Sequence, residues 1–303
     1  MKTKITYFLV GILLLVFNYQ NRITSIDRTT LNLIEEVNSY DTEKLWTGFK
    51  NRDYIKDIRY NSSKEFRYDR GNIIKKSPDQ PVASIEALKE RDTPLIKAIP
   101  FEKFRDIIDL GNSSNSNAEI KYKSVIIHES FHCFQMEHGL SEVIDITDNS
   151  EYEDPNYQQF QSMCKKLDED DIYKKLWETE YKSLLSLYEN RDSSEYEKSR
   201  NKRLAYIKSK FPKDYDTFIE ILSYQEFIEG TARFVEEKYM VDQYNDPYIK
   251  YRDRLFNNID ESSYSEGSLK AKILDRYSPN WKDNLDFSKK NNFDKIFKEG
   301  NIL

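Results

Sequence analysis

The chain has 303 residues, of which 33% are charged, and its formal net charge is −6. Aromatic residues make up 14% of it, which is enough bulky apolar material for a packed core, so disorder of the whole chain is not expected. Phosphate binding needs clustered positive charge, and this acidic chain has no dense Lys/Arg stretch, so nucleic acid is excluded as an expected partner.

The N-terminal segment is first basic and then apolar. Lys2 and Lys4 precede a mostly apolar run from Ile5 to Phe17, which is typical of a secretory signal. Residues 18–22 contain neither a small-x-small cleavage site nor a lipobox cysteine, so a retained anchor and a removed signal peptide are both open. We therefore expect an exported protein, either secreted or anchored through residues 5–17 to the outer face of the cytoplasmic membrane, with 1–22 as the signal or anchor.

Residues 23–112 form the next predicted unit. Two β-like runs, Tyr54–Tyr60 and Glu65–Tyr68, flank a polar turn at 61–63 and predict a hairpin. Prolines at 78, 81, 94 and 100 favour loops and short strands over long helices. We expect a small β-containing subdomain here, followed by a polar linker at 113–117.

The remainder, residues 113–303, has helical apolar spacing almost to its end. The predicted helices span about 117–138, 155–192, 194–210, 214–240, 247–257 and 265–275. A β-containing part followed by an α-rich part predicts an α+β fold. The two cysteines, Cys133 and Cys164, could form a disulfide or both remain free.

Residues 128–132 read His-Glu-Ser-Phe-His, which is a His-Glu-x-x-His motif. On a helix, the imidazoles of His128 and His132 project from one face at a separation that suits one zinc ion. The chain has only three histidines, so a chance match is a poor explanation. Two hydrogen-bonded core histidines are the structural alternative.

The predicted helix over 117–138 has signals at both ends. Ser116 and Glu119 have the spacing of a capping box, and Gly139 is placed to end the helix. The motif would then sit in the middle of the helix. In this setting zinc lowers the pKa of a water molecule and Glu129 acts as general base, so Glu129 is expected to act rather than to bind the metal.

Glu229 is the first candidate for the third protein ligand. It interrupts a largely apolar helical face, and Gly230 and Ala232 beside it would let another backbone come close. The structural alternative is a surface ion pair with Arg233, four residues later.

His138 is the second candidate, because it lies six residues after His132, the spacing of the metzincin pattern His-Glu-x-x-His-x-x-Gly-x-x-His. Gln135 occupies the glycine position of that pattern. Without the glycine the helix has no ready way to turn and bring His138 round. An ordinary histidine at a helix end is the alternative.

These motifs resemble the gluzincins, zinc peptidases that carry His-Glu-x-x-His on one helix and a glutamate ligand on a later one. Residues 229–232 match the Glu-Gly-x-Ala motif of one branch, and 264–267 match the Tyr-x-x-Gly that follows in its aminopeptidases. The resemblance implies a zincin-like fold, zinc bound by His128, His132 and Glu229, and Tyr264 as the residue that stabilises the oxyanion.

A second resemblance is to uncharacterised bacterial peptidase-like proteins with His-Glu-x-Phe-His-x-x-Gln and Trp-x-Gly-Phe motifs, matched here by 128–135 and 46–49. One departure from the gluzincin pattern is spacing, since 96 residues separate His132 from Glu229. Residues 155–210 would then be an insertion. The Gly-x-Met-Glu-Asn type motif that binds a substrate amine is missing, so aminopeptidase activity is not implied.

The sequence therefore predicts an exported zinc-dependent peptidase that acts on a peptide or protein substrate. Two alternatives remain open at this point. One is a metzincin-like peptidase that uses His138, and the other is a non-catalytic zinc-containing binding or anchoring protein. An intact Glu129 argues against the latter, because a purely structural zinc site needs no base.

Overall fold

The computed structural model describes residues 25–78, 82–109, 115–140, 155–244, 258–283, 285–288 and 290–302. The predicted signal or anchor at 1–22 and the predicted helix at 247–257 lie outside these residues. Within them, no helix has both the length and the apolar character needed to cross a membrane.

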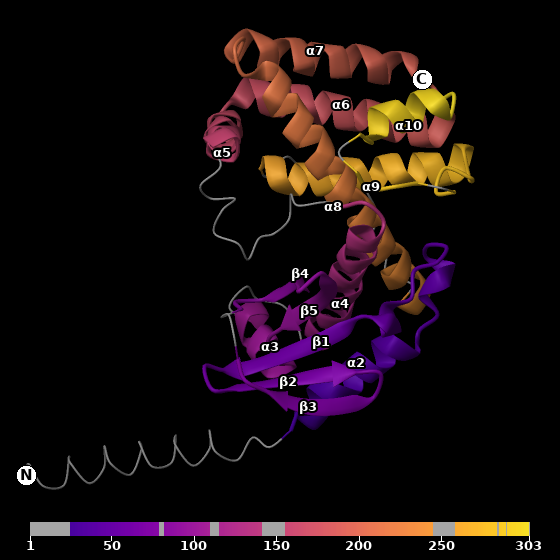
Figure 1. Ribbon diagram of the computed structural model, residues 1–303. Helices are drawn as coiled ribbons and strands as arrows, with labels where there is room; N and C mark the ends of the chain where they lie inside the picture. Colours follow the sequence, from indigo (N-terminus) through magenta and orange to yellow (C-terminus); the bar gives the residue numbers. More distant parts are fainter. Residues whose placement is uncertain are drawn as a thin grey trace, which may run out of the picture.

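The fold is α+β, as predicted. One mixed sheet lies in the N-terminal part, and helices make up the rest (Figure 1). All strands fall within the predicted range 23–112, yet the buried apolar side chains of both parts form one continuous cluster. The boundary between a β-containing and a helical subdomain stays a prediction.

The sheet has the strand order β3-β2-β1-β5-β4, so β3 and β4 are its edges. Only β1 and β5 pair in parallel; the other neighbours are antiparallel. The strands are β1 (Ile55–Asn61), β2 (Lys64–Asp69), β3 (Asn72–Lys76), β4 (Ile85–Glu90) and β5 (Thr93–Ala98). The predicted hairpin is confirmed as β1 and β2.

The two faces of β1 differ in chemistry. Ile58 and Tyr60 are buried on the apolar face, because successive side chains of a strand point to opposite sides. On the other face, Asp57 pairs with Arg67 of β2 and Lys76 of β3 at 2.8 and 2.9 Å. The apolar face is thereby directed towards the helices.

Two helices in the N-terminal part were not predicted, and the expectation of loops and short strands within 23–112 was wrong to that extent. Helix α2 (Arg28–Ser39) buries Leu33, Ile34 and Val37, and Asp27 caps it by accepting from the Thr30 N–H. Helix α3 (Phe101–Asp109) follows Pro100. Both are short, and their helical spacing was hidden among turn-forming residues.

The later helices are α4 (Asn115–Glu137), α5 (Pro155–Asp168), α6 (Asp171–Asn190), α7 (Ser194–Lys210), α8 (Tyr215–Tyr244), α9 (Ile259–Tyr277) and α10 (Phe293–Glu299). The single helix predicted over 155–192 is two helices. Asp170 separates them, because its carboxylate accepts from the Ile172 and Tyr173 N–H groups and starts α6. Helix α9 begins before the predicted 265, at the cap Asn258.

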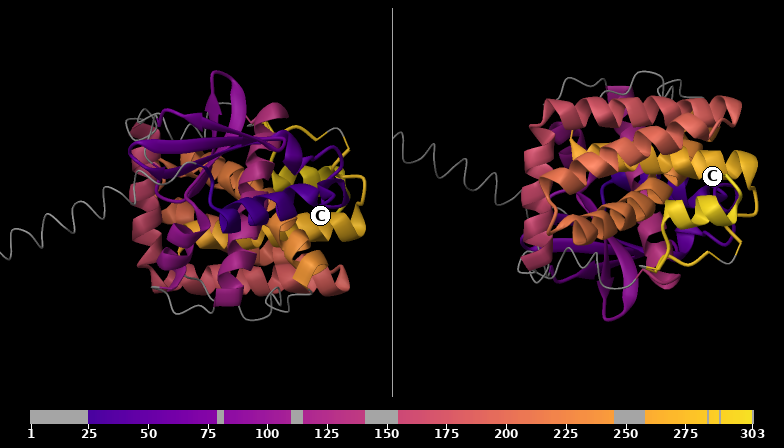
Figure 2. Two further views of the ribbon diagram at one scale, coloured as in Figure 1. Left: turned by 90° about the horizontal axis from the view of Figure 1, so that it is seen from below. Right: turned by 90° about the horizontal axis from the view of Figure 1, so that it is seen from above.

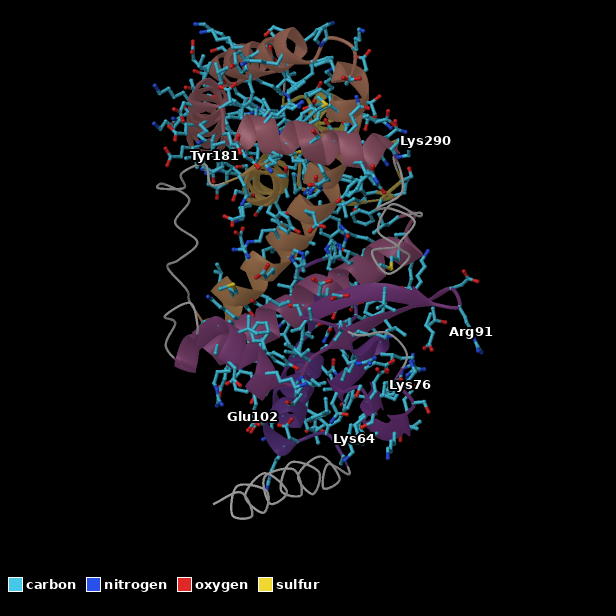
Figure 3. All side chains as sticks on the ribbon, turned by 90° about the vertical axis from the view of Figure 1, so that its left-hand side faces the viewer. Lys64, Lys76, Arg91, Glu102, Tyr181 and Lys290 are labelled. Carbon is cyan, nitrogen blue, oxygen red and sulfur yellow. The ribbon has the colours of Figure 1, made fainter. Side chains whose placement is uncertain are left out.

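Helix α4 connects the two parts of the molecule. It packs on β4 and β5 on one side and on α8 on the other, while α6 and α9 pack together beyond α8. Seen from above, the helical layer lies in front and the sheet lies behind it (Figure 2). Figure 3 shows the same separation, with Lys64, Lys76 and Arg91 at the sheet and Tyr181 and Lys290 at the helical end.

The Trp-x-Gly-Phe segment packs behind the motif helix. Trp46 and Phe49 lie against Phe131 with ring centroids 5.0 and 5.3 Å apart. Gly48 between them has a φ of +81°, a left-handed conformation that glycine adopts without strain. Trp46 also lies against Phe234 of α8, with ring centroids 6.3 Å apart, so the segment packs on both helices and contributes no polar group to the motif.

Candidate metal centre

Helix α4 carries the His-Glu-x-x-His motif, as predicted, but in its C-terminal half rather than in its middle. It begins at Asn115, so Ser116 lies inside the helix rather than at its N-cap, and the predicted capping box is wrong. Gly139 follows the helix with a φ of +104°, which is the left-handed conformation expected of a glycine that ends a helix.

Three ligand-type atoms converge between α4 and α8. The Nε2 atoms of His128 and His132 are 3.1 Å apart. Oε2 of Glu229 lies 3.4 Å from the first and 3.3 Å from the second. All three side chains are largely buried, so water cannot fully solvate them.

The spacing of these atoms fits a tetrahedral metal site. Ligand atoms at about 2.0 to 2.1 Å from one ion in a tetrahedron lie about 3.3 to 3.4 Å from one another. The three observed separations are 3.1 to 3.4 Å. A set of three would leave a fourth position for water or substrate.

The partner of His128 shows which imidazole nitrogen faces this point. Its Nδ1 lies 3.2 Å from Oε2 of Glu236, which also accepts from Arg233 Nη1 at 2.9 Å. Ser124 donates to the other oxygen of Glu236. A carboxylate paired with arginine only accepts, so Nδ1 of His128 is the donor, and in the neutral imidazole the lone pair is on Nε2, the atom that faces the convergence.

His132 has a neutral partner instead. Its Nδ1 lies 2.6 Å from Oε1 of Gln135, one turn further along α4. Its Nε2 therefore also presents a lone pair to the point that Glu229 faces. Three acceptors around one point repel each other unless a cation or protons lie between them.

The pKa values of Glu229 and His128 are shifted against the effect of burial, in part by the contact between the two side chains. Burial acts to raise the pKa of Glu229, but the adjacent His132 and His128 outweigh it and hold that pKa well below its usual value. Burial acts to lower the pKa of His128, but hydrogen bonds with Glu229 and Glu236 raise it to about 10. The pocket therefore favours positive charge at this point.

Glu129 lies beside the convergence but faces another partner. Its carboxylate lies within 4.8 Å of the two imidazole ligand atoms, and its Oε2 accepts from the Ala87 N–H of edge strand β4 at 2.9 Å. Burial raises its pKa, although the two imidazoles oppose the rise. The Glu229 oxygen thus lies within 3.4 Å of both imidazole nitrogens, whereas Glu129 is hydrogen-bonded to the Ala87 N–H.

Tyr264 reaches the same site from α9. Its ring lies parallel to that of His128, with centroids 5.9 Å apart and an interplanar angle of 16°. Helix α9 can approach α8 this closely because Gly267 and Gly230 face each other at the crossing. Gly230 was expected to admit the helix that carries the motif; it admits α9 instead.

His138 stays apart from the cluster. Its Nδ1 donates to the Phe134 carbonyl at 2.8 Å, and its ring stacks on that of Phe134 at 4.0 Å. It lies exposed at the end of α4, which runs straight on as the missing glycine at 135 predicts. Its position is that of an ordinary histidine at a helix end.

Arg233 does not form the surface pair with Glu229 that was the alternative for that carboxylate. It binds Glu236 and Glu237 at 2.9 and 3.1 Å. These pairs are three and four residues apart, so helical geometry allows them as readily as the pair with Glu229.

Two polar residues of the site, Glu236 and Gln135, were not predicted from the sequence. Both had a readable signal. Glu236 lies seven residues after Glu229, which places it on the same face of α8, and Gln135 has the same relation to His128 on α4. The contribution of the Ala87 N–H depends on the tertiary fold and had no signal in the sequence.

The chain matches no protein-family model, no curated protein and no solved structure. The interpretation of the site therefore depends on its motif and its geometry.

Proposed function

We propose that the protein is a zinc-dependent peptidase. The observation that carries the proposal is the convergence of His128 Nε2, His132 Nε2 and Glu229 Oε2 at tetrahedral spacing, with a second carboxylate, Glu129, beside them. Two imidazoles and one carboxylate are a ligand set found in catalytic zinc sites, which keep one position open. When bound, zinc would supply Lewis-acid activation of water and of the substrate carbonyl.

Glu129 is the proposed general base. A base must lie next to the attacking water without itself binding the metal. Burial raises the pKa of Glu129, which brings it closer to the pH at which a general base is most effective. The Ala87 N–H holds one carboxylate oxygen, so the other is left to accept the proton of the water.

Strand β4 favours a peptide as the substrate. The Ala87 N–H points away from β5 towards Glu129, and in an antiparallel strand residues two positions away have the same direction. Ile85 and Lys89 therefore also direct backbone groups to the open edge. An extended peptide can pair with such an edge, which would place its backbone beside Glu129.

Tyr264 is the proposed oxyanion stabiliser. Its ring stacks beside His128, and a phenol at the margin of the site can donate a hydrogen bond to charge that develops on the substrate carbonyl oxygen. The proposed export through residues 1–22 would place this activity outside the cytoplasm.

The test combines metal analysis with turnover. Full-length protein in mild detergent should bind about one zinc ion and cleave members of a mixed peptide library. Glu129→Gln keeps size and hydrogen bonding but cannot take the proton, so zinc should stay while turnover falls about a hundredfold or more.

Two other outcomes are informative. Zinc without any cleavage by the unmodified protein would favour the non-catalytic zinc protein. Loss of zinc together with activity in Glu129→Gln would make Glu129 a ligand.

A further inference from the structure

We propose that Gln135 is a positioning residue that fixes His132 with its proton on Nδ1 and its lone pair on Nε2. This inference rests on the proposed function, because it concerns a ligand of the proposed zinc site. It adds a residue outside the ligand set and specifies what that residue does.

The hydrogen bonds of Gln135 permit one orientation of its amide. One terminal atom lies 2.9 Å from the Ile228 carbonyl and 2.8 Å from Thr231 Oγ1, both on α8. A carbonyl can only accept, and the Thr231 hydroxyl already donates to carbonyls of its own helix. The atom that faces α8 must therefore be the NH₂ group.

The opposite end of the amide is then fixed as the oxygen. It lies 2.6 Å from Nδ1 of His132, and because an amide oxygen only accepts, Nδ1 must carry the proton. The lone pair of His132 is left on Nε2, which faces His128 and Glu229. Two acceptors on α8 thus determine the tautomer of a histidine on α4.

The contacts of Gln135 connect α4 to α8 beside the three converging atoms. It is fully buried, and its partners Ile228 and Thr231 lie on either side of Glu229 in the chain. Glu236 makes the matching connection in the opposite direction, from α8 to His128. His132 is therefore oriented by Gln135, which is itself held by acceptors on α8. His128 is oriented by Glu236, which is itself held by Arg233.

Partners of this kind contribute about 10- to 100-fold to metal affinity when they are removed from other sites. We expect Gln135→Met, which keeps length and apolar volume, to weaken zinc binding by about that factor in a chelator competition assay. A role in packing alone would leave the affinity within about twofold, because methionine fills a similar volume.

A second readout follows the imidazole proton directly. The chain has three histidines, so their ring resonances in zinc-loaded protein are few enough to assign by mutation. In the unmodified protein the Hδ1 of His132 should be a slowly exchanging, downfield signal. Gln135→Met should shift it and speed its exchange, while the Hδ1 of His128 stays in place.

Two further variants complete the test. Gln135→Glu still accepts from Nδ1 but cannot donate to Ile228, so the His132 signal should persist even if stability falls. Ser130→Ala is the matched control, since Ser130 is a buried polar residue of α4 whose partners are Asn51 and Ile126, and it should lower stability without changing zinc affinity.

An unchanged His132 Hδ1 signal in Gln135→Met, or its loss in Gln135→Glu, would overturn the inference. So would unchanged zinc affinity in Gln135→Met. Failure of the proposed function has a different signature, which is an unmodified protein that binds no zinc.

Discussion

Glu229 is a carboxylate that faces two imidazoles in a buried position. Its nearest ion-pair partners are those imidazoles, even though Arg233 lies one turn away on the same helix. A buried carboxylate in contact with two histidine nitrogens is costly unless a cation neutralises it. Its position is therefore better explained by metal binding than by a contribution to stability.

The first residue-scale prediction separates the two candidate third ligands. Glu229→Ala should weaken zinc binding by several orders of magnitude, because it removes one of three protein ligands. His138→Ala is the matched control and should leave zinc content and turnover nearly unchanged. The reverse pattern, measured by equilibrium dialysis and peptide cleavage, would make the protein metzincin-like.

Tyr264→Phe is the second prediction at this scale. The ring would keep its stacking on His128, so zinc affinity and thermal stability should hold. Turnover should fall about 10²- to 10³-fold through kcat, because a donor to the developing oxyanion is lost. An effect on KM alone would assign Tyr264 to substrate binding instead.

Single residues show how far the sequence could lead. His128, Glu129 and His132 were readable because the chemistry of a zinc site requires fixed spacing within one helix. Tyr264 lies next to His128, and the role that the resemblance implies for it stays a prediction. The seven-residue spacing puts Gln135 and Glu236 on the same helical faces as His128 and Glu229, but their contacts depend on how α4 packs against α8, and that packing has no local signal.

At the scale of elements, the crossing of α8 and α9 depends on a pair of glycines. A Cβ on Gly267 would overlap the Glu226 carbonyl oxygen and Gly230 Cα, and a Cβ on Gly230 would overlap the backbone of Gly267. The two helices can therefore touch through their backbones. This contact sets how near α9 brings Tyr264 to His128.

Gly267→Ala tests that contact. Because the obstructing atoms are backbone, the helices must separate, and the free energy of unfolding should fall by about 1 to 3 kcal/mol or more. Turnover should fall with zinc content unchanged, since Tyr264 moves and the ligands do not. Gly300→Ala is a milder control, because there the nearest atom is the Ser278 hydroxyl, which can rotate away.

Element types were easier to predict than element ends. Long helices such as α7 and α8 have apolar spacing sustained over many turns and were predicted almost to their bounds. The break between α5 and α6 was missed because apolar spacing continues across it, and only the capping carboxylate of Asp170 marks it.

At the scale of the molecule, a buried ionic network joins three helices of the layer opposite the sheet. Arg203 of α7 binds Glu180 of α6 at 2.5 Å and Glu266 of α9 at 3.2 Å. Arg200 adds a second contact to Glu180 at 3.1 Å. All four side chains are buried, so their charges depend on one another for compensation.

Arg203→Met should therefore destabilise the protein by about 3 to 5 kcal/mol, because it leaves two buried carboxylates short of positive charge. Lys198→Met on the same helix is the matched control. Its ion pair with Glu195 is exposed, so its loss should change the free energy of unfolding by less than about 1 kcal/mol in denaturant titrations. Equal losses of stability in the two variants would mean that the buried network stabilises the protein no more than an exposed ion pair does.

Composition and patterning were sufficient to predict the α+β class and a helical C-terminal part. They could not predict strand order, because the parallel pair β1 and β5 joins segments with three other strands, β2, β3 and β4, between them in the chain. Nor could they predict the charged network, whose members are hydrophilic residues that a sequence pattern assigns to the surface.

The distance along the chain between α4 and α8 has a kinetic consequence. His128 and His132 come together within one turn of helix, which forms in about a microsecond or less. Glu229 is 101 residues away from His128, so it arrives only after a long segment of chain has closed. On the proposed site, a folding chain would first bind a metal ion weakly through the His128 and His132 nitrogens. The affinity would rise when the Glu229 carboxylate arrives. The rate at which the ion is released during unfolding would then report the rate at which α4 and α8 separate.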